Sequence, residues 1–247
     1  MDATRHTLAG GEPTAPATPG SYGVAPAGGF RLPDATRLGP VHLQVADLDH
    51  ALGFYAGLLG FRPLARGANT AALGAAGDEA PVVVLHARAG ARPMAPRGRL
   101  GLYHTAFLLP DRASLGRFVR RLAALGVRAG AGDHLVSEAF YLTDPDGLGV
   151  EVYADRPRDL WRRVGRELLM ATDPVDAADL ARAAGDVPWD GMPAGTRVGH
   201  VHLHVGDLAR AGAFYGDALG FDRTTARYPG ALFLGAGGYH HHVGTNT

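Results

Sequence analysis

The chain has 247 residues, 46% of them hydrophobic and 19% charged, so it can bury a substantial core as one large domain or two small ones. Basic and acidic residues balance at 24 each, which argues against nucleic acid as a partner. There is no cysteine, which excludes disulfides, thiolate nucleophiles and sulfur-ligated metals, so any metal must be held by nitrogen and oxygen.

The first 33 residues are rich in alanine, proline, glycine and threonine without sustained periodicity, and this composition predicts a flexible tail. Residues 1–20 lack the basic and apolar segments of a signal peptide. No later stretch approaches the roughly 18 consecutive apolar residues that cross a membrane. We therefore expect a cytoplasmic protein without a membrane partner.

A strand followed by a helix opens the ordered part of the chain. Residues 41–45 alternate as a strand does, Asp47 can cap the helix that follows, and Gly60 can end it. Three short strands are predicted next, at residues 61–66, 70–73 and 81–87. Together these elements predict one β-α-β-β-β unit.

This unit recurs along the chain. Residues 39–61 align with residues 199–221 at 13 identities in 23 positions, and a more divergent copy runs from Leu102 to Tyr153. We expect an α+β fold in which repeated βαβββ units form cupped mixed sheets with the helices outside. The expected division is a flexible tail at 1–33, a first module of units one and two at 34–154, a linker at 155–196 and the third unit at 197–247.

Histidines are concentrated in the third unit. His200, His202 and His204 alternate along a predicted strand, so their side chains share one face. The range His240–His242 lies in a second apolar segment. Imidazoles are costly to bury without partners, whereas two neighbouring strands with inward imidazoles offer the nitrogen ligands that a divalent metal needs. The pattern therefore predicts a metal site.

The repeat, with its recurring Asp-Leu, Phe-Tyr and Leu-Gly-Phe, resembles the vicinal oxygen chelate superfamily, which contains glyoxalase I, extradiol dioxygenases and fosfomycin-resistance proteins. Five segments are most similar to its catechol-2,3-dioxygenase group, namely residues 101–104, 144–147, 150–157, 199–208 and 238–242. The resemblance covers the chain from Leu38 onward. Because two-module members have four units, it implies that a fourth unit is missing from this sequence.

The resemblance also implies particular metal ligands. In the superfamily, a ligand on the first strand lies seven residues before the aspartate that starts the helix, which selects His104 and His200. The same count in unit one reaches Pro40, which cannot bind a metal. The ligand implied on the last strand is Glu151, and its expected counterpart in the third unit is His241. His240 and His242 remain alternatives to His241.

The ligand strands carry further candidate residues. His202, His204 and Tyr153 share the inward faces of His200 and Glu151, and we predict that they contact the substrate or move protons. Imidazoles with one carboxylate suit Fe(II) first, and then Mn, Ni or Zn.

The resemblance implies extradiol cleavage of a small aromatic diol by Fe(II) and O2. Two alternatives stay open: isomerase or lyase chemistry with Ni, Zn or Mn at the same site, and a protein that binds small aromatic molecules or confers resistance without catalysis. If units two and three form the site, unit one is left without a partner. We would then expect it to expose an apolar sheet, so that a homodimer is possible.

Overall fold

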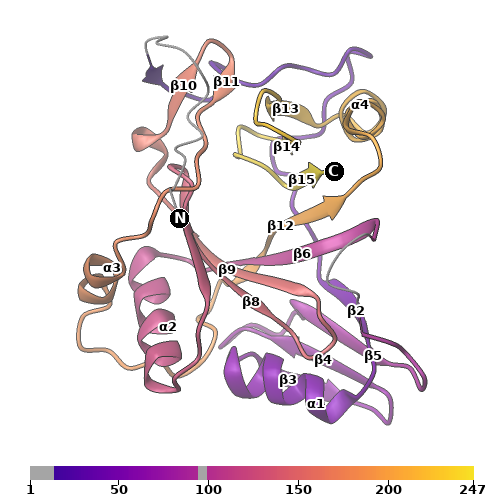
Figure 1. Ribbon diagram of the computed structural model, residues 1–247, viewed down its shortest axis with the longest axis vertical. Coiled ribbons are helices and arrows are strands. Elements are labelled where there is room, and N and C mark those ends of the chain that lie inside the picture. The colour runs from indigo at the N-terminus through magenta and orange to yellow at the C-terminus, as the bar shows by residue number, and fades with distance from the viewer. Residues whose placement is uncertain (1–13, 94–98) are drawn as a thin grey trace.

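The computed structural model describes residues 14–93 and 99–247, and it confirms the α+β class with cupped mixed sheets. An eight-stranded sheet and a four-stranded sheet carry the three repeated units (Figure 1). Within the described residues, no helix is both long and apolar enough to span a bilayer.

Unit one forms the four-stranded sheet by itself. Its strand order is β2-β5-β4-β3, with β2 and β5 parallel. The Asp47 carboxylate caps the helix by accepting from the backbone N–H of His50 at 2.7 Å, and Gly60 ends it at φ 87°, a conformation that favours glycine. The elements of the unit are β2 (Val41–Val45), α1 (Leu48–Leu52), the π-helix η1 (Gly53–Leu58), β3 (Arg62–Arg66), β4 (Thr70–Gly74) and β5 (Val83–Ala87).

Units two and three repeat this pattern, each with an aspartate cap at the start of its helix. Unit two consists of β6 (Gly101–Leu108), α2 (Arg112–Ala124), β7 (Gly130–Asp133), β8 (Ser137–Thr143) and β9 (Gly149–Asp155). Unit three consists of β12 (Arg197–His204), α4 (Leu208–Ala211), the π-helix η3 (Gly212–Ala218), β13 (Asp222–Thr225), β14 (Ala231–Gly235) and β15 (Val243–Asn246).

The eight-stranded sheet joins unit two to unit three. Its order is β13-β14-β15-β12-β6-β9-β8-β7, so the first strands of the two units, β12 and β6, pair antiparallel at its centre. Units one and two were expected to form a module at 34–154, and the site was expected between units two and three. The strand pairing places units two and three in one sheet. The two units that supply the expected ligands are therefore the two that share a sheet.

Unit one packs against unit two through side chains rather than strand pairing. One hydrophobic core runs through both units, and the rings of Phe61 and Phe107 meet in it with centroids 4.9 Å apart. The buried Tyr55 hydroxyl of η1 donates to Asp144 Oδ2 at 2.9 Å, in the turn between β8 and β9. Unit one thus supports the turn from which the Glu151 strand begins.

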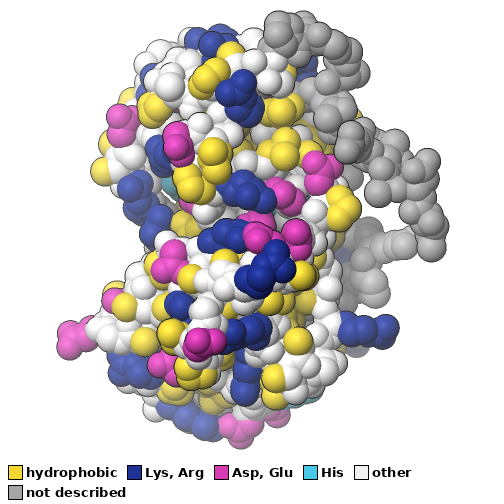
Figure 2. Space-filling view, turned by 90° about the vertical axis from the view of Figure 1, so that its left-hand side faces the viewer, with side chains coloured by type: hydrophobic (Ala, Val, Ile, Leu, Met, Phe, Trp, Pro, Cys, Tyr) yellow, Lys and Arg dark blue, Asp and Glu magenta, His cyan; other side chains and the backbone are white. Residues whose placement is uncertain are grey.

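The other face of the unit-one sheet is polar, contrary to the apolar face expected for an unpartnered unit. His42 on β2 and His86 on β5 are exposed there, with His42 Nδ1 3.0 Å from His86 Nε2. Gln44 is exposed beside them. Figure 2 shows basic and acidic side chains interspersed on one face of the molecule, in keeping with the zero net charge.

The segments outside the units pack onto them. Residues 14–33 were expected to belong to a flexible tail, but Val24 bridges to Arg223 of β13 and the Arg31 guanidinium pairs with the Asp222 carboxylate. Residues 1–13 lie outside the described residues. The expected linker 155–196 carries short elements that cover units two and three: η2 (Arg158–Leu160), β10 (Arg162–Val164), which pairs with β1 (Ala15–Pro16), β11 (Glu167–Leu168) and α3 (Ala177–Ala183).

Candidate metal centre

Three neighbouring strands bring two histidines and a glutamate to one point of the eight-stranded sheet. Ala106 on β6 lies opposite His200 on β12 and opposite Glu151 on β9. Residues opposite each other in a sheet share a face, and so does His104, two residues before Ala106 on β6. The small Ala106 side chain therefore lies between three larger groups that project to the same side.

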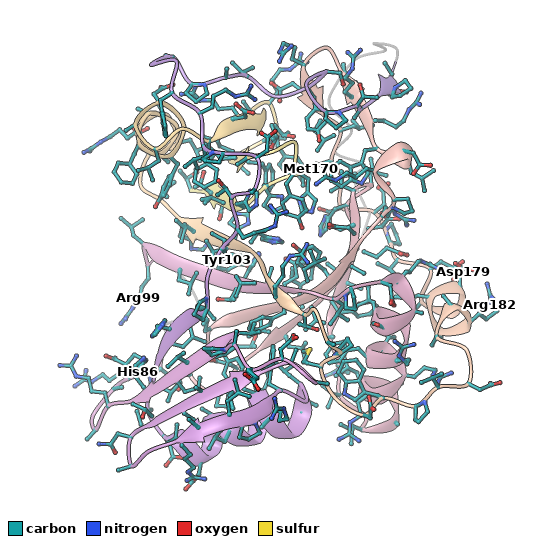
Figure 3. The ribbon with its side chains drawn as sticks, turned by 180° about the vertical axis from the view of Figure 1, so that it is seen from behind. His86, Arg99, Tyr103, Met170, Asp179 and Arg182 are labelled. Carbon is teal, nitrogen blue, oxygen red and sulfur yellow. The ribbon has the colours of Figure 1, made fainter. Side chains whose placement is uncertain are left out.

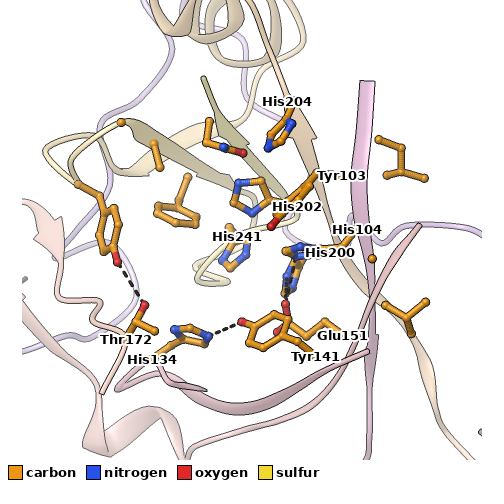
Figure 4. A pocket seen from close by; sticks show the side chains of 18 of the residues that line it. Tyr103, His104, His134, Tyr141, Glu151, Thr172, His200, His202, His204 and His241 are labelled. Carbon is orange, nitrogen blue, oxygen red and sulfur yellow. Dashed lines mark hydrogen bonds and ion pairs between the residues drawn. The ribbon is translucent and has the colours of Figure 1, made fainter. Parts of the chain in front are cut away.

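The three side chains meet closely. His104 Nε2 lies 3.1 Å and His200 Nε2 lies 3.2 Å from Glu151 Oε2. One ligand-type atom from each residue lies within 4.8 Å of the other two, and all three residues are buried. Figure 4 shows the two imidazoles converging on the carboxylate at the wall of a cavity.

The protonation states match those that a metal requires. Burial alone would raise the pKa of Glu151, but the imidazoles of His200 and His104 hold it well below its usual range, so the carboxylate is ionised at neutral pH. Burial lowers the pKa of His200 to about 4, so this imidazole is neutral. Metal ligands of these types bind as the carboxylate and the neutral imidazole.

Unmatched polar atoms are a further sign that the three residues fit a metal. His104 Nε2 is buried and, although it lies close to Glu151, the angle does not make a hydrogen bond. His200 Nδ1 is also buried without a partner in the described residues. An unpaired buried nitrogen costs free energy, which a metal bound to His104 would offset. Two imidazoles and one carboxylate suit Fe(II), Mn, Ni or Zn.

Comparison with known proteins identifies the family. Residues 37–152 match the model of the Glyoxalase/Bleomycin resistance protein/Dioxygenase superfamily, and residues 197–222 match that of the bleomycin resistance protein-like N-terminal family. A catechol-2,3-dioxygenase from Bacillus subtilis (strain 168) is 46% identical over 215 residues, which cover 85% of this chain and 74% of that protein. The chain belongs to the glyoxalase/bleomycin resistance protein/dioxygenase superfamily.

Solved structures of lower similarity were also matched. The cppA protein from Streptococcus pneumoniae TIGR4 is 12% identical at a TM-score of 0.47, and the match covers 66% of this chain and 60% of that one. The Mn(II)-bound glyoxalase from Novosphingobium aromaticivorans is 24% identical at a TM-score of 0.39, covering 84% of this chain and 60% of that one.

His241 was expected to be a fourth metal ligand. It lies beside the cluster of His104, Glu151 and His200 but is not part of it. Its ring centroid is 4.1 Å from that of His200, and it lines the same cavity. The strand register explains the difference. Ala106 and His202 are equivalent, because each lies two residues after the first-strand ligand of its unit. Glu151 lies opposite Ala106, and Gly244 lies opposite His202. The structural counterpart of Glu151 in unit three is therefore Gly244, which offers no ligand.

Gly244 has a steric role instead. A Cβ atom built there would lie 2.7 Å from His202 Nδ1, so the glycine makes room for the His202 ring. Burial lowers the pKa of His202 to about 3, and its Nε2 is buried without a hydrogen-bond partner in the described residues. His202 and His204 both line the cavity, where the His204 ring stacks on Tyr103 with centroids 4.3 Å apart.

Tyr153 does not line this cavity. It is fully buried, and its hydroxyl lies 2.6 Å from the hydroxyl of Tyr239, which in turn lies 3.2 Å from Asp155 Oδ1. Because the carboxylate can only accept, Tyr239 donates to Asp155 and Tyr153 donates to Tyr239. The Tyr153 hydroxyl is thus bonded to Tyr239 and does not reach the cavity, although its ring centroid lies 4.9 Å from that of His200.

Tyr141 and His134 line the cavity next to the cluster and were not predicted from the sequence. Tyr141 on β8 lies directly opposite Glu151, and its hydroxyl lies 2.5 Å from His134 Nε2. His134 Nδ1 lies 2.7 Å from the carbonyl oxygen of Ala171, so this nitrogen must carry the proton of a neutral ring. Its Nε2 then accepts from Tyr141. Counting outward from the turn around Asp146 would have placed Tyr141 opposite Glu151.

The cavity has a volume of about 1010 Å³ and opens beside the cluster. Apolar side chains from β6, β8, β14 and the 155–196 segment form much of its wall, among them Leu102, Leu142, Met170 and Phe233. Tyr103 and Met170, which both line the cavity, are labelled in Figure 3, where the molecule is seen from behind relative to Figure 1. The same wall carries many polar groups, among them six histidines, namely His104, His134, His200, His202, His204 and His241. A concave wall that combines apolar surface with polar side chains is typical of a small-molecule site.

Proposed function

We propose that this protein is a metal-dependent ring-cleaving dioxygenase that acts on a small aromatic diol. The observation that carries the proposal is the convergence of His104, Glu151 and His200 at the wall of a large, mostly apolar cavity. The B. subtilis relative at 46% identity is named a catechol-2,3-dioxygenase, which supports this reaction class. Two imidazoles and one carboxylate with open positions are typical of non-haem Fe(II) oxygenases.

In this proposal His104, Glu151 and His200 hold Fe(II), with Mn, Ni or Zn as alternatives. A divalent metal bound there would act as a Lewis acid toward the two adjacent oxygens of the diol and would lower the pKa of their hydroxyl groups. His241 was predicted from the sequence as a fourth ligand. In this proposal it instead accepts a proton from one of the substrate hydroxyls.

The other residues of the cavity orient the substrate and keep water away. The Tyr141 hydroxyl donates to His134, so its oxygen can accept a hydrogen bond from a substrate hydroxyl. Phe233 and Met170 offer apolar surface to an aromatic ring. Burial keeps the His202 imidazole neutral next to the cluster, so it does not repel a bound cation.

Anaerobic reconstitution with Fe(II), followed by addition of catechol and O2, tests this function. We expect stoichiometric O2 uptake and a yellow ring-cleaved product, and no product from the metal-free protein. Failure to convert any of several catechols would refute the proposal. Turnover that persists without O2 would instead identify the isomerase or lyase class.

The cytoplasmic location and the homodimer remain predictions. In the described residues, the edge of β2 that faces away from β5 pairs with no other strand, so a second copy could add to it. Sedimentation at several protein concentrations measures whether a dimer forms.

A further inference from the structure

A line of hydrogen-bonding side chains leads from the surface to the cavity beside the proposed metal ligands. His240 Nε2 lies 3.0 Å from Asp155 Oδ1, and His240 Nδ1 lies 2.7 Å from His241 Nδ1. The His240 ring is fully buried, whereas the Asp155 side chain is 27% exposed. His241 Nε2 has no hydrogen-bond partner in the described residues, and His241 lines the cavity.

The proton positions along this line follow from the chemistry of its members. The Asp155 carboxylate can only accept, so His240 Nε2 carries a proton and donates it. A neutral His240 then has no proton on Nδ1, and the single proton between the two Nδ1 atoms belongs to His241. A neutral His241 then carries its one ring proton on Nδ1, so its Nε2 has a free lone pair.

We propose that Asp155 and His240 are positioning residues that fix His241 in the tautomer whose bare Nε2 faces the cavity. The tautomer itself follows from the geometry, whereas its use as a proton acceptor rests on the proposed function. The arrangement resembles the way in which a carboxylate orients a catalytic imidazole in other enzymes.

In the reaction, the relay moves protons without any change of oxidation state. The O–H bond of a substrate hydroxyl breaks and its proton joins His241 Nε2. The proton on His241 Nδ1 can then pass to His240 Nδ1, so that the positive charge comes to lie on His240 next to the Asp155 carboxylate. The reverse transfers return the proton to the product.

The relay also explains why three histidines follow one another at this point. They lie on a bend just before β15, so consecutive side chains face different surroundings. His240 contacts Asp155, His241 lines the cavity, and His242 Nδ1 accepts from the backbone N–H of Ala236 at 3.2 Å. Tyr239 donates to the same Asp155 oxygen and helps to hold the carboxylate in place.

The test is nitrogen-15 NMR of the histidine rings in the metal-free protein, in which the shifts of Nδ1 and Nε2 show which atom carries the proton. The His241 signals are assigned from their loss in H241Q. In the wild type we expect His241 to be protonated on Nδ1. In H240F the acceptor is removed while a ring is kept, so we expect protonation to move at least in part to Nε2. H242Q, which keeps an acceptor for Ala236, is the matched control and should leave the tautomer unchanged.

Two results would overturn the relay: a wild-type His241 protonated on Nε2, or a tautomer that H240F leaves unchanged. If H240F does not fold, the wild-type spectrum alone still decides. Because no metal or substrate is present, these results are independent of the proposed function. The catalytic role is tested by activity: both H240F and D155N should lower kcat at least tenfold with unchanged metal content. If the wild type itself shows no dioxygenase activity, only the proposed function is refuted.

Discussion

Replacing Glu151 with glutamine isolates the contribution of the carboxylate to metal binding. The amide keeps the size and shape of the side chain but removes the negative charge from a residue that is 2% exposed. Changing the partners of metal ligands typically weakens binding by 10-fold to 100-fold, and removing the only anionic ligand should weaken it by at least about 100-fold. The metal-free protein should stay folded, because the amide can donate to the unpaired His104 Nε2.

This loss can be read as a change in stability. At a metal concentration 100 times the wild-type Kd, binding stabilises the wild-type fold by about 2.7 kcal/mol. With a 100-fold higher Kd, the same concentration stabilises E151Q by only about 0.4 kcal/mol. Denaturant unfolding with and without Co(II) or Fe(II), under anaerobic conditions, measures both values.

Glu138 provides the matched control, because it is also 2% exposed but pairs with Arg112 away from the cluster. E138Q should lower the stability of the metal-free protein and leave the metal-dependent increment unchanged. If E151Q keeps the full 2.7 kcal/mol, the carboxylate is not a ligand and the reasoning fails.

Three further predictions follow from single contacts and from burial. Y141F removes the hydroxyl bonded to His134 and should lower kcat by about 100-fold with metal content unchanged; equal kcat values would exclude a role in proton positioning. Y55F removes the buried donor to Asp144 and should lower the free energy of unfolding by about 1–3 kcal/mol in urea titrations, so a change below about 0.5 kcal/mol would show that the bond contributes little. Burial lowers the pKa of His242 to about 4, whereas the unfolded chain takes up this proton near pH 6.5. The unfolded state therefore binds more protons between these values, and the metal-free protein should lose stability as pH falls from 6.5 toward 4; a constant urea midpoint at pH 7, 6 and 5 would contradict this.

The repeat and three of the proposed ligands could be found from the sequence because they depend on local patterns. Aspartate caps and alternating strands recur at a fixed offset, and the seven-residue ligand spacing implied by the resemblance to the superfamily then selects His104 and His200. The Asp-Pro-Asp-Gly turn fixes the position of Glu151 in the same local way. Each of these inferences needs only the spacing within one unit.

The pairing of units could not be predicted so directly. Units one, two and three each start with a similar strand, β2, β6 or β12, that can pair at its edge, and the spacing within a unit does not say which two edges meet. That choice depends on packing between residues far apart in the chain. The alternation of residues 41–45 already puts His42 and Gln44 on one face of unit one, whereas the placement of His86 beside them depends on the register between β2 and β5.

The placement of His241 and Tyr141 depended on register between strands. The bend before β15 shifts the count along the chain, so that Gly244 rather than His241 lies at the position equivalent to Glu151. Tyr141 and His134 lie on or beside a neighbouring strand, and only cross-strand pairing brings them to the site. A histidine triplet likewise does not reveal which ring faces the cavity.

The most direct test of this account is an anomalous-scattering map of crystals grown anaerobically with Fe(II) or Co(II). We predict one strong peak within bonding distance of His104 Nε2, His200 Nε2 and a Glu151 carboxylate oxygen, and none at this position in E151Q crystals. A peak only at the exposed His42 and His86 pair, or no peak at the cluster of the wild type, would contradict the claim that units two and three together hold the metal.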